Sequence, residues 1–164
     1  MKSFGFSLIE LLTSLSIIAI LMAISFPALR NFSSRTQDEI LQQQLLQSIE
    51  FAKREAIARH ASVALCQTNN QQTCSGNFAD GQMIYIEDEK QILSIRQSSS
   101  KHGVIHFRSY PDYRQYLLFL STGWVTDNAS FWHCHKKKPI WAIAISKTGR
   151  VRVIDDIHKM NFKC

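Results

Sequence analysis

The sequence lacks the short motifs that mark many enzyme active sites. It contains no G-x-S-x-G nucleophile elbow, no glycine-rich phosphate loop and no H-E-x-x-H metal-binding helix. Glycine and proline are scarce, at 6 and 3 of the 164 residues, and no long tract is rich in proline, glycine or serine. With 45% hydrophobic residues, the composition is that of an ordered chain. We therefore expect one folded domain with an appendage, no disordered tail and no enzyme activity.

A repeated β-α-β pattern is also absent, which argues against a parallel sheet. Apolar residues instead recur at three- and four-residue spacing between Arg30 and His60, as they do on one face of a helix. Together with the apolar stretch that precedes it, this spacing predicts a single long helix from Phe6 to about His60, which Pro27 can bend. The apolar face consists of Leu41, Leu45, Ile49, Ala52 and Ala56.

Beyond residue 60, short runs rich in branched and aromatic residues alternate with turn-forming residues. Three of the expected turns are Glu87 to Lys90, Thr122-Gly123 and Lys147 to Gly149. The pattern predicts antiparallel sheet, and with the helix an α+β fold. The predicted strands are Ser62 to Cys66, Gln82 to Glu87, Gln91 to Arg96, Val104 to Phe107, Tyr116 to Leu120, Ile140 to Ser146 and Arg150 to Ile154.

The N-terminus begins with a positive charge and then becomes mostly apolar. Lys2 precedes an apolar stretch from Phe6 to Leu29, which as a helix is long enough to cross most of a bilayer. Gly5 stands before this stretch, and no small-residue cleavage site closes it before Pro27, unlike an ordinary signal peptide. Glu10 lies near its start, where a carboxylate is costly unless a partner neutralises it. Cleavage in front of the helix would leave it on the mature protein; an uncleaved signal anchor is the alternative.

The segment GFSLIELL at positions 5 to 12 resembles the processing site of type IV pilins and of type II secretion pseudopilins. This resemblance implies that a prepilin peptidase cuts after Gly5 and that Phe6 becomes the N-methylated first residue. It also implies that Glu10 pairs with the N-terminal amine of a neighbouring subunit, since either charge alone is costly in an apolar filament core. Residues 1–5 are then a leader peptide and residues 6–29 a helix held in the inner membrane before assembly. Residues 30–164 form a periplasmic or extracellular globular domain.

Looser matches along the chain resemble the GspH/FimT group of minor pilins and pseudopilins. They are Val63 to Cys66 after the helix, Ser121 to Gly123 in mid-domain and Thr148 to Arg152 in the last hairpin. The resemblance implies the pilin fold, in which a long helix lies across antiparallel strands, and implies other major and minor pilins as partners. The tail Asp155 to Cys164 departs from the pattern of the group and extends the last strand.

Four cysteines are an even number, and behind an export signal they lie in an oxidising compartment where disulfides form. Three pairings can be drawn. We favour Cys66 with Cys74, which flank a short polar segment, and Cys134 with Cys164, which ties the last residue to the domain. Free buried thiols are the alternative.

The histidines and tryptophans of the second half suggest other binding chemistry. His133 and His135 flank Cys134, and a metal site would need them to converge with His158 or Cys164. We expect no metal and no cofactor, because Cys134 is better used in a disulfide and histidines flanking a strand residue need not converge. We expect the three tryptophans to lie in the core or to pack on a disulfide. They are Trp124, Trp132 and Trp141.

Positive charge is concentrated towards the C-terminal end of the chain. Residues 92–164 hold 12 Lys or Arg against 4 Asp or Glu, whereas residues 1–91 hold 7 against 9. This asymmetry indicates an acidic partner such as nucleic acid or anionic lipid; a basic surface that serves solubility alone is the alternative. The motif GRxR at Gly149 to Arg152 lies at a predicted hairpin, and residues two apart in a strand point the same way. Arg150 and Arg152 would thus form a fork suited to phosphate oxygens.

The GRxR motif also carries a functional resemblance, since FimT-like pilins with this motif are associated with DNA capture during natural transformation. We therefore predict a minor type IV pilin that binds extracellular double-stranded DNA without sequence preference, with Lys159 and Lys163 widening the patch if the tail folds back. The alternative is a structural or priming minor pilin, or a GspH-like type II secretion pseudopilin, without DNA binding. The predicted DNA-binding residues are Lys136, Lys137, Lys138, Lys147, Gly149, Arg150 and Arg152.

Overall fold

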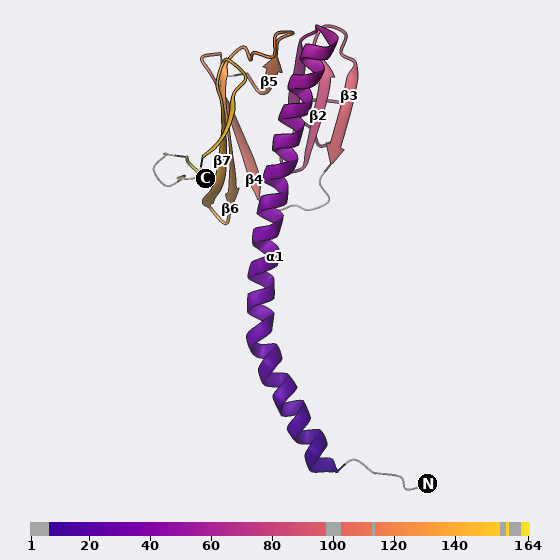
Figure 1. Cartoon of the computed structure of the whole chain (residues 1–164), viewed down its shortest axis with the longest axis vertical. Helices are drawn as coiled ribbons and strands as arrows, with labels where there is room; N and C mark the ends of the chain where they lie inside the picture. The colour runs from indigo at the N-terminus through magenta and orange to yellow at the C-terminus, as the bar shows by residue number, and fades with distance from the viewer. Residues whose placement is uncertain (1–6, 98–102, 113, 155–156, 158–161) are drawn as a thin grey trace, which may run out of the picture. The chain divides into compact units, whose positions relative to one another are not determined.

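The computed structural model describes residues 7–97, 103–112, 114–154, 157 and 162–164, without the side chains of residues 27, 28, 30 and 31. The predicted cleavage and methylation residues, Gly5 and Phe6, lie outside the described residues, as do His158 and Lys159. One helix, α1 (Leu8–Arg59), precedes the strands of the described chain (Figure 1). The chain divides into two compact units, Met1–Gln37 and Asp38–Cys164, and α1 contributes to both.

In the first unit, the helical segment Leu8–Phe26 is apolar and none of it is buried. Its 19 residues have a mean hydropathy of 2.2, so by length and composition the segment can cross a membrane. Three of its hydroxyl groups bond within the helix. Those of Thr13, Ser14 and Ser16 donate hydrogen bonds of 2.8 to 3.0 Å to carbonyl oxygens three or four residues earlier. Glu10 lies in the first turn, which leaves its carboxylate as the one charge in this segment.

In the second unit, α1 buries the apolar face that the sequence predicts. The side chains of Leu41, Leu45, Ile49, Ala52 and Ala56 are at most 3% exposed. The helix ends at Arg59, where His60 adopts a positive φ of 50° and the amide of Ala61 donates to the carbonyl of Ala56. This 6→1 hydrogen bond is the Schellman arrangement that closes many helices, here with histidine in place of glycine. The helix therefore ends one residue before the predicted position.

The strands form two antiparallel four-stranded sheets, which confirms the α+β prediction. In Figure 1 the sheet that contains β2 and β3 lies on one side of α1, and the sheet that contains β6 and β7 lies on the other. The first sheet has the order β3-β2-β1-β5 and the second the order β4-β6-β7-β8. The bounds are β1 Val63–Gln67, β2 Gly81–Ile86, β3 Ile92–Gln97, β4 Val104–Tyr110, β5 Tyr116–Phe119, β6 Asn128–His135, β7 Lys138–Ile145 and β8 Val151–Ile154.

Strand β6 is missing from the predicted strands, although it is central in its sheet. It pairs with β4 along one side and with β7 along the other. Polar residues such as Asn128, Ser130 and His133 interrupt its hydrophobic pattern, so the strand signal in the sequence is weak there. The remaining predicted strands are found with small shifts at their ends, the largest being β4, which extends three residues further to Tyr110.

The larger hydrophobic core joins the helix to both sheets. Leu45 and Ile49 of α1 belong to the same buried cluster as Phe119 of β5 and Ile143 of β7. Aromatic rings fill its centre, and the rings of Phe78 and Phe131 meet edge to face with their centroids 5.0 Å apart. All the buried members of this cluster lie between Leu41 and Ile145, so a fragment that begins near residue 30 retains the whole core.

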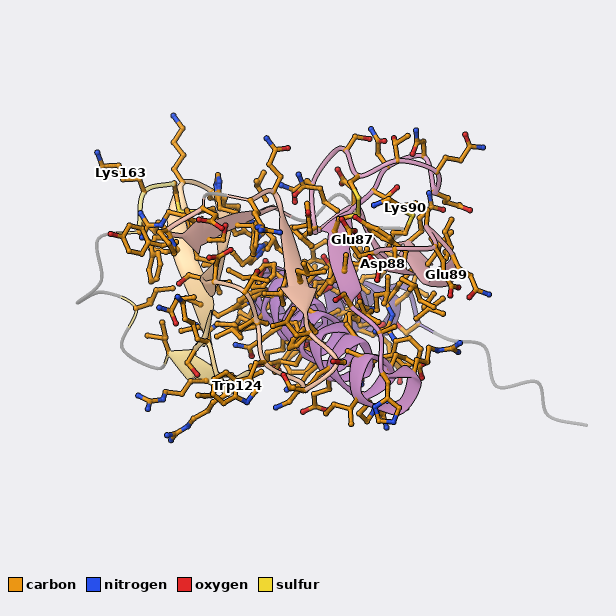
Figure 2. All side chains as sticks on the ribbon, turned by 90° about the horizontal axis from the view of Figure 1, so that it is seen from above. Glu87, Asp88, Glu89, Lys90, Trp124 and Lys163 are labelled. Carbon is orange, nitrogen blue, oxygen red and sulfur yellow. A yellow bond between two sulfur atoms is a disulfide. The ribbon has the colours of Figure 1, made fainter. Side chains whose placement is uncertain are left out.

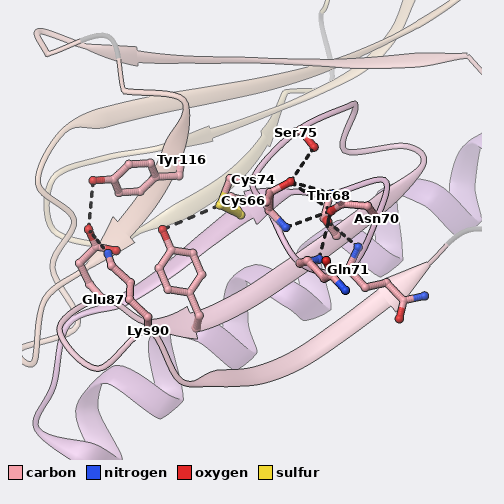
Figure 3. Close-up of a disulfide and its surroundings, with 12 residues drawn as sticks. Cys66, Thr68, Asn70, Gln71, Cys74, Ser75, Glu87, Lys90 and Tyr116 are labelled. Carbon is pink, nitrogen blue, oxygen red and sulfur yellow. Dashed lines mark hydrogen bonds and ion pairs between the residues drawn. A yellow bond between two sulfur atoms is a disulfide. The ribbon is translucent and has the colours of Figure 1, made fainter.

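A smaller buried cluster lies on the other face of the first sheet, beside the loop that the Cys66–Cys74 disulfide closes (Figure 3). Within this loop, Asn70 Oδ1 accepts hydrogen bonds from the amides of Gln72 and Thr73, at 3.1 and 2.9 Å. Burial, and then the neighbouring Glu87 carboxylate, raise the pKa of Tyr85 above its usual range. The cluster consists of Ala64, Cys66, Met83, Tyr85 and Leu118.

Candidate nucleic-acid interface

The turn between β7 and β8 carries the GRxR motif and has a defined backbone. The amide of Gly149 donates to the carbonyl of Ser146 at 2.8 Å, and the amide of Ser146 donates to the carbonyl of Arg150 at 3.1 Å. Gly149 has a φ of +71°, a conformation that is strained for residues with a side chain. A methyl group there would also overlap the carbonyl oxygen of Gly123. The glycine of the motif is therefore required by the backbone.

Three hydrogen bonds fix this turn to its neighbours. Lys53 Nζ of α1 donates to the carbonyl of Gly149 at 2.9 Å. The amide of Val125 donates to the carbonyl of Lys147 at 2.9 Å, and the amide of Lys147 donates to Asn128 Oδ1 at the same distance. The turn is thus held by the helix, by the loop before β6 and by β6 itself, which reduces the entropy that its residues would lose on binding a ligand.

Arg150 and Arg152 are both exposed and line the same surface groove of about 280 Å³. Arg152 pairs with Ala144 of β7 in the sheet register, and Arg150 follows the same alternation two residues nearer the turn. The rest of the groove lining consists mainly of small or polar side chains from β6, β7 and the turn, among them Ser130 and Ser146. The structure thus places both guanidinium groups on one face, as strand alternation predicts.

The lysines of the β6–β7 turn do not join this arginine pair. Lys136 and Lys137 lie in the turn with φ of 49° and 62°, and Lys138 is the first residue of β7. Strand β7 separates them from the Gly149 turn, and its eight residues span about 24 Å at ~3.4 Å per residue. The structure therefore does not bring these lysines together with the arginine pair, because the strand between the two turns holds them apart.

The last two residues of the chain, Lys163 and Cys164, also lie at the lysine end. Cys164 is bonded to Cys134, close to the β6–β7 turn, and the indole of Trp132 donates to the carbonyl of Lys163 at 3.1 Å. The disulfides Cys66–Cys74 and Cys134–Cys164 confirm the pairing predicted from the sequence. Lys163 therefore extends the lysine group and not the arginine group, and Figure 2 shows it far from Trp124, which lies beside the Gly149 turn.

The three tryptophans occupy different environments, and the expectation of a core position is wrong for Trp124. Its side chain is 55% exposed in the turn after β5, next to Val125, whose amide is bonded to the Lys147 carbonyl. An exposed indole offers a surface on which bases or sugars can stack. Trp132 is half-buried between the rings of His106 and Phe162, and Trp141 is buried. Residue type alone does not reveal which tryptophan is exposed.

His133 and His135 converge on a residue that the sequence analysis does not single out. His133 Nε2 lies 2.8 Å from Asp38 Oδ1, and His135 Nδ1 lies 3.4 Å from the same oxygen. The indole of Trp141 donates to the Asp38 carbonyl at 2.9 Å. The three side chains offer two nitrogens and an oxygen within 4.8 Å of one another, one ligand fewer than a structural zinc site. These contacts join α1 to β6 at the start of the second unit of the chain.

Two family models match the sequence. The model of the type II transport protein GspH matches residues 41–149, and that of the prokaryotic N-terminal methylation motif matches residues 1–26. The first match covers well over half of the chain. It begins at Leu41 in α1 and ends at the Gly149 turn. No curated protein matches the sequence significantly.

Several solved structures are similar. The type IV minor pilin FimU of Pseudomonas aeruginosa has a TM-score of 0.59 at 14% identity, over 75% of this chain and 92% of FimU. A second crystal form of FimU gives 0.55 at 15% identity, over 71% and 91%. The minor pseudopilin EpsH of the type 2 secretion system of Vibrio cholerae gives 0.49 at 13% identity, over 72% and 95%. At such identities the likeness to FimU concerns the fold alone, and it confirms the predicted pilin fold.

Proposed function

The chain belongs to the GspH family of type II transport proteins, and from this premise we propose that it is a minor pilin that binds DNA through its last hairpin. The observation that carries this proposal is the Arg150 and Arg152 pair on one exposed face of a fixed turn. Guanidinium groups donate paired hydrogen bonds to phosphate oxygens, and two of them side by side suit a phosphate backbone. Binding of this kind has little sequence preference and weakens as salt rises.

The second part of the proposal concerns how the N-terminal segment anchors the subunit in the membrane and in the filament. The methylation motif supports cleavage by a prepilin peptidase after Gly5 and methylation of Phe6. The 19-residue apolar segment would lie in the inner membrane before assembly and in the filament core afterwards, where Glu10 would pair with the terminal amine of a neighbouring pilin. Residues 30–164 would then face the periplasm and later the filament surface, where extracellular DNA is accessible. The protein acts in this scheme as a binding module and not as an enzyme.

The test is a titration of residues 31–164, which retain the whole hydrophobic core, with unrelated DNA duplexes at several salt concentrations. Each phosphate contact contributes about 0.9 to the slope of log affinity against log salt. Loss of two contacts in the Arg150→Gln, Arg152→Gln double variant should therefore lower the slope by about 2 and the affinity about 60-fold at ~0.1 M salt. A matched control removes two charges elsewhere, with Arg59→Gln and Lys90→Gln, and should bind nearly as the unaltered fragment does.

The second candidate function is a structural or priming subunit of a type IV pilus or a type II secretion pseudopilus, without DNA binding. The family match favours it directly, since the GspH model describes a transport protein. A fragment that binds duplexes no better than the double variant would support this candidate. In cells, normal filament numbers with lost DNA uptake in the double variant would point to DNA binding, while loss of filaments would point to assembly.

A further inference from the structure

The face that carries Arg152 continues across the whole second sheet. Residues that are register partners in neighbouring antiparallel strands point to the same face. Arg152 of β8 pairs with Ala144 of β7, Ala144 with Ser130 of β6, and Ser130 with Arg108 of β4. One row of side chains therefore crosses all four strands, with an arginine at each end and only small residues between them.

The next row, two residues along each strand, is also polar. Tyr110 of β4 pairs with Asn128 of β6, and the amide of Ser146 is bonded to the carbonyl of Arg150. Tyr110 is 61% exposed. The residues at the alternate positions, such as Phe131, are buried in the core, which shows that both rows face outward. The outer face of this sheet is therefore a shallow surface of hydroxyl, amide and methyl groups between two arginine-bearing edge strands.

The charges around Arg108 leave this face positive. Arg108 is exposed, and among the described residues it has no ion pair. The nearby acidic groups Asp112 and Asp127 are instead paired with Arg114, at 3.6 and 3.5 Å. The two outward rows contain no aspartate or glutamate. A polyanion that is bound at Arg150 and Arg152 and extends along the row would thus reach a second exposed cation, Arg108 of β4. It would pass no negative charge in these two rows.

The spacing of the two ends fits a run of phosphates. Three gaps between strands, at about 4.8 Å each, put the backbones of Arg108 and Arg152 about 14 Å apart. One strand of duplex DNA advances about 3.4 Å per nucleotide along the helix axis, so this distance covers about four nucleotides. Because Ser130 and Ala144 are small, the DNA backbone can approach the sheet between the two ends, where the Ser130 hydroxyl can donate to a phosphate.

From this geometry we propose that Arg108 is a second phosphate contact, so that bound DNA lies across the outer face of the sheet from β8 to β4. This inference rests on the proposed DNA-binding function and adds to it the path of the DNA. It separates the arginine pair from the lysines of the β6–β7 turn, which lie at the far end of β7.

The experiment compares Arg108→Gln with Arg59→Gln in the fragment 31–164, by fluorescence anisotropy with one duplex across a series of salt concentrations. Each variant loses one exposed arginine. Arg108→Gln should lower the salt slope by about 1 and the affinity about eightfold at ~0.1 M salt, while Arg59→Gln should change neither appreciably. If Arg108→Gln behaves as Arg59→Gln does, while the Arg150 and Arg152 double variant loses binding, the path is wrong and the DNA-binding function stands.

A titration of the unaltered fragment followed by NMR removes any dependence on how the variants fold. The proposal expects the amide signals of Ser130, Ala144 and Arg108 to shift on adding duplex, together with those of the Gly149 turn. Signals of β3, in the other sheet, should stay unchanged. Shifts confined to the Gly149 turn would overturn the path across the sheet, and the absence of any shift would overturn both the path and the proposed function.

Discussion

Replacing Gly149 by alanine tests whether the backbone of the GRxR turn, and not its charge alone, makes the binding face. A side chain at a φ of +71° costs about 1–2 kcal/mol. The new methyl group also overlaps the carbonyl oxygen of Gly123, a backbone atom that moves only if the two turns separate. Separation would weaken the bonds of Gly149 to Lys53 and of Lys147 to Val125, each worth about 1 kcal/mol. We therefore expect a total loss of about 2–4 kcal/mol in the free energy of unfolding.

The assay is urea unfolding of the fragment 31–164, combined with the DNA titration. Duplex affinity should fall although no charge is removed, because Arg150 and Arg152 would no longer be held in one fixed arrangement. Gly76→Ala is the control, since Gly76 also has a positive φ, of 95°, but its methyl group would meet the side chain of Asn69. The control should cost less stability and leave DNA binding intact. If Gly149→Ala is as stable as the control and binds DNA normally, the turn does not need its glycine and our account of it fails.

Two further variants test features away from the turn. Asp38→Ala removes the acceptor that two histidines share and should cost about 1–3 kcal/mol in urea unfolding; an unchanged free energy of unfolding would show that the cluster is not a stabilising contact. Replacing Cys134 and Cys164 together by serine opens a loop of sequence separation 30 and should cost about 3–4 kcal/mol. The same double variant should bind DNA normally, because the disulfide lies at the lysine end of β7. A loss equal to that of the arginine double variant would contradict this expectation.

Local patterns predict much of the fold because local physics determines it. The buried face of α1 follows from its 3.6-residue period, and most strands follow from their branched and aromatic residues. Strand β6 is not predicted, because the burial of its polar residues depends on a partner that is distant in the sequence. His133 is completely buried, and its polar ring has a hydrogen-bond partner there in Asp38, which is 95 residues earlier and 2.8 Å away. No period within the segment Asn128–His135 reveals that pairing.

The candidate site, too, is predicted only in part by local sequence patterns. Strand alternation predicts that Arg150 and Arg152 share a face, and the structure places them so. The sequence does not show how far Lys138 lies from this pair; strand β7, which runs straight between the two turns, places them at opposite ends. Arg108 is the opposite case: it is distant in the sequence but lies in the same row. It is 44 positions from Arg152, and only the register of three strand pairings brings the two into one row.

The anchoring of the Gly149 turn also has a mechanical consequence. A DNA molecule that is pulled while held at Arg150 would transmit force to β8, a short edge strand joined to the sheet by four register pairs with β7. When a strand is peeled from one end, its hydrogen bonds break in succession. The bonds from Lys53 to Gly149 and from Val125 to Lys147 lie at that end, so the load is divided between helix, loop and sheet before any ladder bond carries it alone. The subunit would thus resist tension through α1, the same helix whose apolar segment would hold it in a filament.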